Sequence, residues 1–166
     1  MNYCKWCTAL LAATIFSAST SAAPGPRRDL DDIGKVIAQF QQAIKDKNKD
    51  AMQDLFVDQN SPLSASASDK TLAIVRAKKA DAAKILPSTS AKFAEQVGTA
   101  TSPNEERFSN IKINADDAVA AVSFDFTFLV SAKPVNVGKE AWLLVKTEKG
   151  WKISAIVYSM NFPDKR

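Results

Sequence analysis

GKEAWLLVKTEKGWKISAIVYSMNFP, residues 138–163, contains two runs of aromatic and aliphatic residues on either side of Glu148-Lys149-Gly150. Strand-forming runs that flank a short segment containing glycine are typical of a β-hairpin. We expect a three-residue loop at this segment, with Gly150 in the left-handed conformation and Thr147 paired with Trp151. The stretch therefore predicts the last two strands of an antiparallel sheet.

The register of this hairpin distributes its side chains over two faces. A slip of one residue would expose half of the apolar set, so burial favours the register with one uncharged face. That face carries Ala141, Leu143, Val145, Trp151, Ile153, Ala155 and Val157. The other face carries Glu140, Trp142, Leu144, Lys146, Lys152, Ser154, Ile156 and Tyr158. We expect the uncharged face to contact the core and the other face to lie outside.

A second alternating segment precedes the hairpin. AVAAVSFDFTFLV, residues 118–130, brings Phe124, Phe126 and Phe128 to one face and polar side chains to the other. FSNIKI, residues 108–113, predicts a shorter strand before it. Together with the hairpin, these segments predict an antiparallel meander of four strands.

Helical spacing dominates the first third of the domain. In residues 29–47, DLDDIGKVIAQFQQAIKDK, apolar residues recur three and four apart, which predicts a helix with one apolar stripe. A second helix is expected over 49–56, and shorter ones over 69–79 and 91–97 with Ser68 and Ser90 as N-caps. We expect the opening helical hairpin to cover the apolar face of the sheet, which gives an α+β fold.

The first 22 residues have the layout of a secretory signal peptide. One charge, Lys5, precedes an uncharged run around residues 9–18, and small residues follow at Thr20-Ser21-Ala22. We place cleavage after Ala22, because cleavage one residue later would put Pro24 at the disfavoured position after the cut. The sequence thus predicts a signal peptide over 1–22, a flexible leader over 23–28, a single domain over 29–163, and export to the periplasm or the medium.

Composition excludes several kinds of partner and cofactor. The net charge is +4, but the basic residues alternate with acids and form no stripe with aromatics, so we expect no nucleic-acid partner. No apolar run after the first 22 residues is long enough to cross a bilayer, so we expect no membrane association after signal cleavage. The chain has no histidine, and its two cysteines, Cys4 and Cys7, lie in the signal peptide. With five glycines and no glycine-rich phosphate loop, we expect neither metal nor cofactor.

Three stretches carry a resemblance to a known family: residues 37–56, IAQFQQAIKDKNKDAMQDLF; residues 105–128, EERFSNIKINADDAVAAVSFDFTF; and residues 136–160, NVGKEAWLLVKTEKGWKISAIVYSM. The chain resembles the nuclear-transport-factor-2-like superfamily over residues 29–162, in particular its SnoaL-like members. The resemblance implies a cone-shaped α+β domain whose sheet curls around a cavity, often dimeric through the outer face of the sheet. It leaves the function open, because the family includes isomerases, dehydratases, hydrolases and modules without catalysis.

The catalytic patterns that the resemblance implies are incomplete in this sequence. Isomerase members use an aspartate base with a tyrosine and a neutral acid, dehydratase-like members rely on histidine, and epoxide-hydrolase-like members need an Asp-Arg-Asp cluster. The expected cavity face has no ionisable group, and Asp54 and Asp58 of the helical region are interpreted as exposed acids at a helix end. We therefore expect the cavity to bind a ligand through Phe40, Phe124, Phe126, Phe128, Leu143, Trp151 and Ile153.

Two functional hypotheses follow, with a third that has no positive signal. The first is an exported, non-enzymatic domain that binds a small apolar ligand or a protein partner. The alternative is a lyase or isomerase with Asp125 and Tyr158 as the acid–base pair and Glu140 beside them; otherwise Asp125 points outward and pairs with a lysine. The third is an inhibitor or immunity-type partner of another protein.

An oligomer is also expected from the assignment of faces. The face predicted to lie outside has an apolar patch bordered by charges, and such patches are more often interfaces than pockets. We expect a homodimer through Trp142, Leu144, Ile156, Tyr158 and Met160.

Overall fold

The computed structural model describes residues 26–164. The predicted signal peptide over 1–22, and residues 23–25 of the predicted leader, lie outside this range. The helices within it are α1 (Pro26–Asp46), α2 (Lys49–Asp54), α3 (Asp69–Arg76) and α4 (Ser90–Gly98). The strands are β1 (Pro62–Ala67), β2 (Ile85–Thr89), β3 (Asn104–Ala115), β4 (Val119–Val130), β5 (Lys133–Thr147) and β6 (Gly150–Met160). None of these helices is long and apolar enough to cross a membrane.

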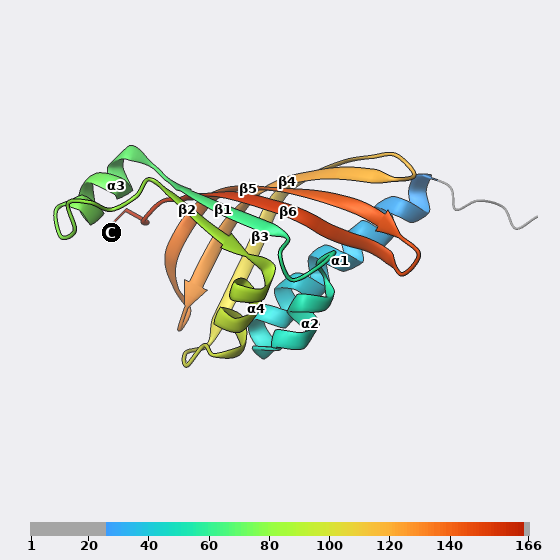
Figure 1. Ribbon diagram of the computed structural model, residues 1–166, viewed down its shortest axis with the longest axis horizontal. Helices are drawn as coiled ribbons and strands as arrows, with labels where there is room; N and C mark the ends of the chain where they lie inside the picture. Colours follow the sequence, from blue (N-terminus) through green and yellow to red (C-terminus); the bar gives the residue numbers. More distant parts are fainter. Residues whose placement is uncertain (1–25, 165–166) are drawn as a thin grey trace, which may run out of the picture.

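The strands form one curved sheet in the order β2-β1-β6-β5-β4-β3 (Figure 1). The meander β3–β6 confirms the predicted four strands, and every neighbouring pair is antiparallel except β1 and β6. Sequence reasoning missed β1 and β2. Their sequences, PLSASA and ILPST, are rich in small and polar residues and contain prolines, which weakens the strand signal. Pro87 is tolerated because β2 is an edge strand.

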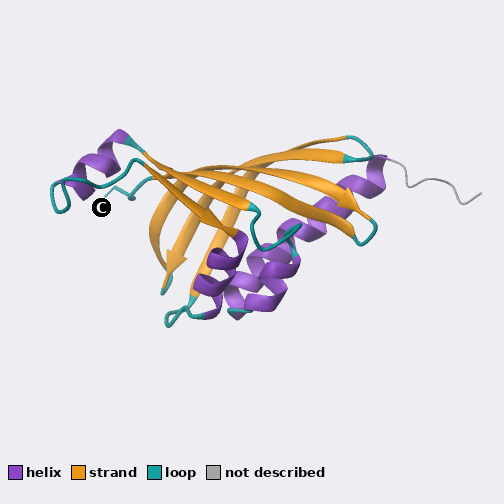
Figure 2. Cartoon of the chain, in the orientation of Figure 1, coloured by secondary structure: helices purple, strands orange, loops and turns teal. Residues whose placement is uncertain are grey.

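The helices lie unevenly on the sheet. Figure 2 shows the sheet curling over α1, α2 and α4, while α3 lies apart, at the far end of β1 and β2. The concave face is therefore covered by the same helical hairpin that the sequence predicts, with α4 added. This side of the sheet holds the core.

Helix α1 supplies the apolar stripe that the sequence predicts. Its buried side chains are Ile33, Val36, Ile37, Phe40, Ala43 and Ile44, whereas Leu30, in the second turn, is 43% exposed. The helix begins at Pro26, so residues 26–28 belong to it rather than to the leader; proline suits the first turn of a helix. The opening segment is thus one long amphipathic helix.

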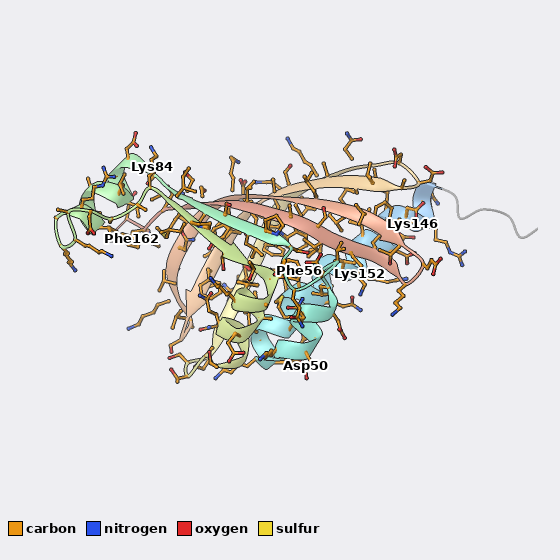
Figure 3. The ribbon with its side chains drawn as sticks, in the orientation of Figure 1. Asp50, Phe56, Lys84, Lys146, Lys152 and Phe162 are labelled. Carbon is orange, nitrogen blue, oxygen red and sulfur yellow. The ribbon has the colours of Figure 1, made fainter. Side chains whose placement is uncertain are left out.

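Two lysines hold the end of the final hairpin to the first two helices, as Figure 3 indicates. Lys146 forms an ion pair with the buried Asp29 of α1, and the Trp151 indole donates to the same carboxylate at 3.2 Å. The ion-paired, hydrogen-bonded carboxylate has a pKa below its ordinary value, chiefly because of the Lys146 hydrogen bond. Lys152 donates to the carbonyl of Asp54 at the end of α2.

Short helices are fixed by local caps. The Ser68 side chain accepts from the Thr71 amide at 3.2 Å and caps α3, as predicted. Helix α4 is capped by Thr89 rather than by Ser90. Ser90 is fully buried and instead donates its hydroxyl to the carbonyl of Asp58 at 2.6 Å. This bond ties the start of α4 to the loop that follows α2.

The β5–β6 hairpin corrects the predicted loop and the predicted faces. Thr147 pairs with Gly150 across a two-residue turn, although Gly150 does have the expected positive φ, 102°. A β-bulge between Leu143 and Leu144 then restores the expected pairing farther along, where Trp142 opposes Ile156.

On β5, and on β6 beyond the bulge, the buried face is the one predicted to lie outside; Trp151 and Ile153, before the bulge, are buried as predicted. Trp142, Leu144 and Ile156 are at most 2% exposed, whereas Leu143 and Val157 are 56% and 55% exposed. The prediction failed because it used the absence of charge to select the core face. The core takes the larger side chains, and the outer face keeps small residues and a few exposed aliphatic ones.

An aromatic cluster explains why this face is buried. The Trp142 ring lies 4.7 Å from Phe40 and 5.1 Å from Phe124, the latter in an edge-on arrangement. Phe108 adds a contact to Phe124 at 4.1 Å between ring centroids. Such clusters bury large apolar areas and gain about 1 kcal/mol per pair beyond burial alone. Trp142 is therefore the centre of the core rather than part of an interface.

Candidate functional site

The concave side of the sheet holds a cavity of about 190 Å³. Apolar side chains make up most of its wall: Phe40, Leu63, Phe93, Phe126, Phe128 and Ile156. Its polar lining residues are Gln96, Glu106, Asn136, Glu140 and Tyr158. Helices α1 and α4 and every strand except β2 contribute, so the curvature of the sheet creates the site.

Glu140 points into this cavity because β5 alternates and its neighbour on the same face is Trp142. Its side chain is buried, with 6% exposed, and accepts a hydrogen bond from the Trp142 indole at 2.6 Å. Burial raises the pKa of the Glu140 carboxyl to about 7, and the Trp142 bond opposes part of that rise. Glu140 thus has a carboxyl that exchanges protons near neutral pH.

Glu106 is the second buried acid of the cavity. On β3, its neighbours Glu105 and Arg107 face outward and pair with each other, so alternation turns Glu106 inward. Its pKa is raised well above the ordinary range by burial and then by the charge of Glu140. Gln41 of α1 donates to its backbone carbonyl at 2.8 Å, but no side chain within 26–164 hydrogen-bonds to its carboxyl.

Tyr158 stands beside this carboxyl pair, Glu106 and Glu140. It lies directly opposite Glu140 in the register of β5 and β6, and its ring meets Phe126 edge-on at 6.2 Å. Burial raises the pKa of the Tyr158 hydroxyl, and the two carboxyls raise it further. The phenol therefore stays protonated and can donate a hydrogen bond into the cavity.

The chemistry of the site follows from what surrounds the carboxyl pair. The cavity lining, all of it within the described residues, includes no lysine and no arginine. The same part of the chain has no group of three or more acids that could hold a metal ion. The two carboxyls line one cavity without a cation, and the charge of Glu140 raises the pKa of Glu106, so a protonated carboxyl can donate while an ionised one accepts. The arrangement can bind a polar group or transfer a proton.

Three of the seven predicted ligand-binding residues line the cavity: Phe40, Phe126 and Phe128. The other four do not. Trp151 and Ile153 are buried in the core, and Phe124 packs in the aromatic cluster. Leu143 lies on the outer face, because the faces of β5 are the reverse of those predicted.

The alternative pairing of Asp125 with Tyr158 is not formed; Asp125 points outward and pairs with a lysine, as the other interpretation of the sequence expected. Asp125 lies on the outer face of β4, forms an ion pair with Lys139 and accepts from Asn110 at 2.6 Å. These partners lower the pKa of its carboxyl, the Lys139 hydrogen bond most of all. Tyr158 lies on the inner face of the same sheet, so the two cannot act together. Of the predicted set, Glu140 and Tyr158 do meet in one site.

The residues predicted to form a dimer interface are also misplaced. Trp142, Leu144 and Ile156 are enclosed within the single chain, and Tyr158 lines the cavity. Met160 is half-buried at the end of β6, where it pairs with Ala67 of β1. None of the five forms an apolar patch on the outer face.

Sequence reasoning missed Glu106. The strand expected from the sequence covers residues 108–113, whereas β3 begins at Asn104 and includes Glu106. Extending the two-residue alternation backward from Phe108, which contacts Phe40 at 6.2 Å between ring centroids, would have turned Glu106 inward. The acids at Asp54 and Asp58 are exposed, as expected.

A second, wider hollow of about 930 Å³ lies on the outer face of the sheet. It includes Asp125 and Lys139, which neutralise each other, and small residues such as Ser64 and Ser159. The smaller cavity is the better candidate site, because its ionisable groups are buried and lack an opposite charge.

Comparison with solved structures shows the fold of this chain. A nuclear transport factor 2-like protein with a cystatin-like fold from Novosphingobium aromaticivorans matches 81% of this chain and 82% of its own, with a TM-score of 0.60 and 12% identity. A candidate dehydratase of the same family from Streptomyces avermitilis matches 84% and 100%, with a TM-score of 0.60 and 12% identity.

A nuclear transport factor 2-like superfamily protein from Salmonella enterica serovar Typhimurium matches 85% and 95%, with a TM-score of 0.58 and 16% identity. No protein-family model and no curated protein matches the sequence. At these identities the likeness is one of fold, which confirms the predicted cone of helices on a curved sheet.

Proposed function

We propose, for a chain with the nuclear transport factor 2-like fold, that the concave cavity binds a small organic molecule against the carboxyl pair. The observation that carries this proposal is the placement of two acids, each only 6% exposed, in an apolar wall without a basic partner. Burial disfavours the ionised form of both carboxyls, and within 26–164 the Trp142 indole, which donates to Glu140, is the side-chain donor to the pair. A ligand that hydrogen-bonds to the pair would offset the cost of this burial.

The size of the cavity limits the ligand. A water molecule takes up about 30 Å³ in the liquid, so 190 Å³ corresponds to roughly six waters. This is smaller than the ~300 Å³ at which typical drug-sized pockets begin. The proposal therefore concerns a compact molecule, for example one ring with a single polar substituent.

A proton-transfer enzyme is the second candidate function, and the pKa of Glu140 favours it. A general base works best when its pKa lies near the working pH, and burial brings this carboxyl to about 7. Tyr158 would donate to the oxygen on which charge develops. In this version Glu140 replaces Asp125 in the lyase or isomerase hypothesis.

Binding is tested by ligand-observed NMR with a set of one-ring fragments. Phe128→Trp should fill the cavity from its wall and abolish fragment signals, while Leu143→Ala on the outer face should leave them unchanged. Fragments that bind equally to Phe128→Trp would place the site elsewhere. Absence of any fragment binding to the unmodified protein would overturn the proposal.

Catalysis is tested on the fragments that bind and carry an acidic C–H bond. In D₂O, the protein should speed exchange of that hydrogen for deuterium, and Glu140→Gln should abolish the exchange while fragments still bind. Exchange at the same rate in the variant would exclude Glu140 as the base.

A further inference from the structure

The lining of the cavity is unbalanced in charge. It includes two carboxyls, and the elements that face them supply only neutral side chains: Phe40 from α1, Phe93 and Gln96 from α4, Leu63 from β1, Phe126 and Phe128 from β4. Tyr158 is the one further titratable group in the lining. Glu106 is nine-tenths buried, faces the cavity and has no hydrogen-bond partner for its carboxyl within 26–164. The missing component is a positive charge.

The aromatic side chains of the cavity wall also favour a positively charged ligand. Four phenylalanines and a tyrosine surround the acids, with Phe40 stacked on Phe93 at 5.6 Å and Phe126 against Tyr158 at 6.2 Å. The faces of aromatic rings carry partial negative charge and attract cations, most strongly where the site is desolvated. Rings and carboxyls together make a surface that suits an ammonium group on a short hydrocarbon body.

We propose that the ligand of this cavity is a small organic ammonium ion, whose charged nitrogen lies against Glu106 and Glu140 and whose hydrocarbon part contacts the phenylalanines. This inference rests on the proposed function, because it takes the cavity to be the ligand site. It adds the chemical class of the ligand.

The competing ligand classes satisfy the site less well. An anion could be accepted only by the protonated carboxyls, and each carboxyl that ionises as the pH rises would repel it. A neutral hydrocarbon would leave the Glu106 carboxyl without a partner and Glu140 with the Trp142 indole alone. A primary ammonium has three N–H donors, enough for Glu106, Glu140 and the hydroxyl oxygen of Tyr158. A hard metal ion prefers six or more oxygen ligands, more than the carboxyl pair supplies.

Binding of a cation should release protons. In the empty cavity, the raised pKa values keep at least one proton on the pair at neutral pH. A bound ammonium favours the ionised carboxylates, so protons leave as it enters, and its affinity rises with pH. No lysine or arginine lines the cavity to compete for the pair.

The test is calorimetry with three matched probes: benzylamine, which is a cation at neutral pH, benzyl alcohol and benzoate. Benzylamine should bind about tenfold or more tighter than benzyl alcohol, and benzoate should not bind. Between about pH 6 and pH 8, affinity for benzylamine should rise, with proton release that shows as a dependence on the ionisation enthalpy of the buffer.

Substitutions of the two glutamates test whether the carboxyl pair causes the tighter binding of benzylamine. Glu106→Gln and Glu140→Gln should each weaken benzylamine binding about tenfold or more and reduce proton release, without weakening benzyl alcohol. Asp125→Asn, an acid on the opposite face of the sheet, is the matched control and should change nothing. The three-probe comparison on the unmodified protein decides the question even where a variant does not fold.

The outcomes separate the two proposals. If benzyl alcohol or benzoate binds in the cavity at least as tightly as benzylamine, the ammonium inference is overturned and the proposed binding function stands. If none of the three probes binds, both are overturned.

Discussion

Glu106 and Glu140 are the two buried acids in a cavity wall that is otherwise mostly apolar. Each is carried into the wall by strand alternation, and each would be more stable in water as an ion. The molecule tolerates them because they hold protons, because Trp142 donates to one of them, and because the cavity reaches both. A buried acid whose pKa is strongly raised and that lines a cavity is a candidate functional group.

The first prediction is that the free energy of unfolding depends on pH because of the carboxyl pair. A carboxyl whose pKa is raised on folding stabilises the folded state below its unfolded pKa, near 4.5, and loses that contribution as pH rises through the folded value, about 7 for Glu140. The free energy of unfolding should therefore fall between about pH 5 and pH 8, by roughly 1–3 kcal/mol.

Glu140→Gln should flatten this fall, because the amide does not ionise and its oxygen can still accept from Trp142. Urea denaturation across the pH range measures the effect, with Asp125→Asn as the control for loss of an exposed acid. A Glu140→Gln variant that keeps the full slope and is less stable at pH 8 would contradict the account.

At the scale of elements, the β5–β6 hairpin determines which side chains meet the helices. Ser154 is the extra residue of the bulge and compensates for the shorter turn. Beyond it Glu140 opposes Tyr158, as the sequence predicts. The pairing there was thus predictable, whereas the inward face was not. The absence of charge on their face predicted that Leu143 and Val157 would be buried. Instead, Trp142 packs against Phe40, and its side of the sheet forms the core.

The second prediction compares two adjacent leucines of this hairpin. Leu144→Ala removes a side chain that is 1% exposed and should cost about 2–5 kcal/mol of unfolding free energy. Leu143→Ala, at 56% exposure, should change stability by less than about 1 kcal/mol. Chemical denaturation of the two variants measures both values, and the reverse order would restore the faces that the sequence suggested.

Helices and strands with a regular spacing of apolar residues were predictable from the sequence. Strands that form only by pairing with a distant part of the chain were not. Helix α1 and the existence of the four strands of the meander follow from spacing, whereas the start of β3 and the bulge in β5–β6 do not. Strands β1 and β2 exist because β6 offers an edge on which the serine-rich PLSASA segment can pair. For the same reason Leu63 could not be assigned to the cavity, and the carboxyl pair could not be assembled from the sequence.

At the scale of the whole molecule, the homodimer remains a prediction, without the five residues first assigned to it. The outer face has exposed apolar side chains, among them Val119, Leu143 and Val157, and exposed apolar patches favour contact between chains. Sedimentation at micromolar concentration should give the mass of two copies, and Leu143→Lys should reduce it to one. A monomeric mass for the unmodified protein would contradict this prediction.

The account depends most directly on the protonation of the carboxyl pair. The measurement is a pH titration of the glutamate side-chain carboxyl carbons by ¹³C NMR, assigned with Glu106→Gln and Glu140→Gln. We predict two glutamates that titrate above the ordinary value of 4.5, with Glu140 near 7 and Glu106 well above the ordinary range. Titration of both residues near 4.5 would show solvated, ionised acids and would contradict the proposed site.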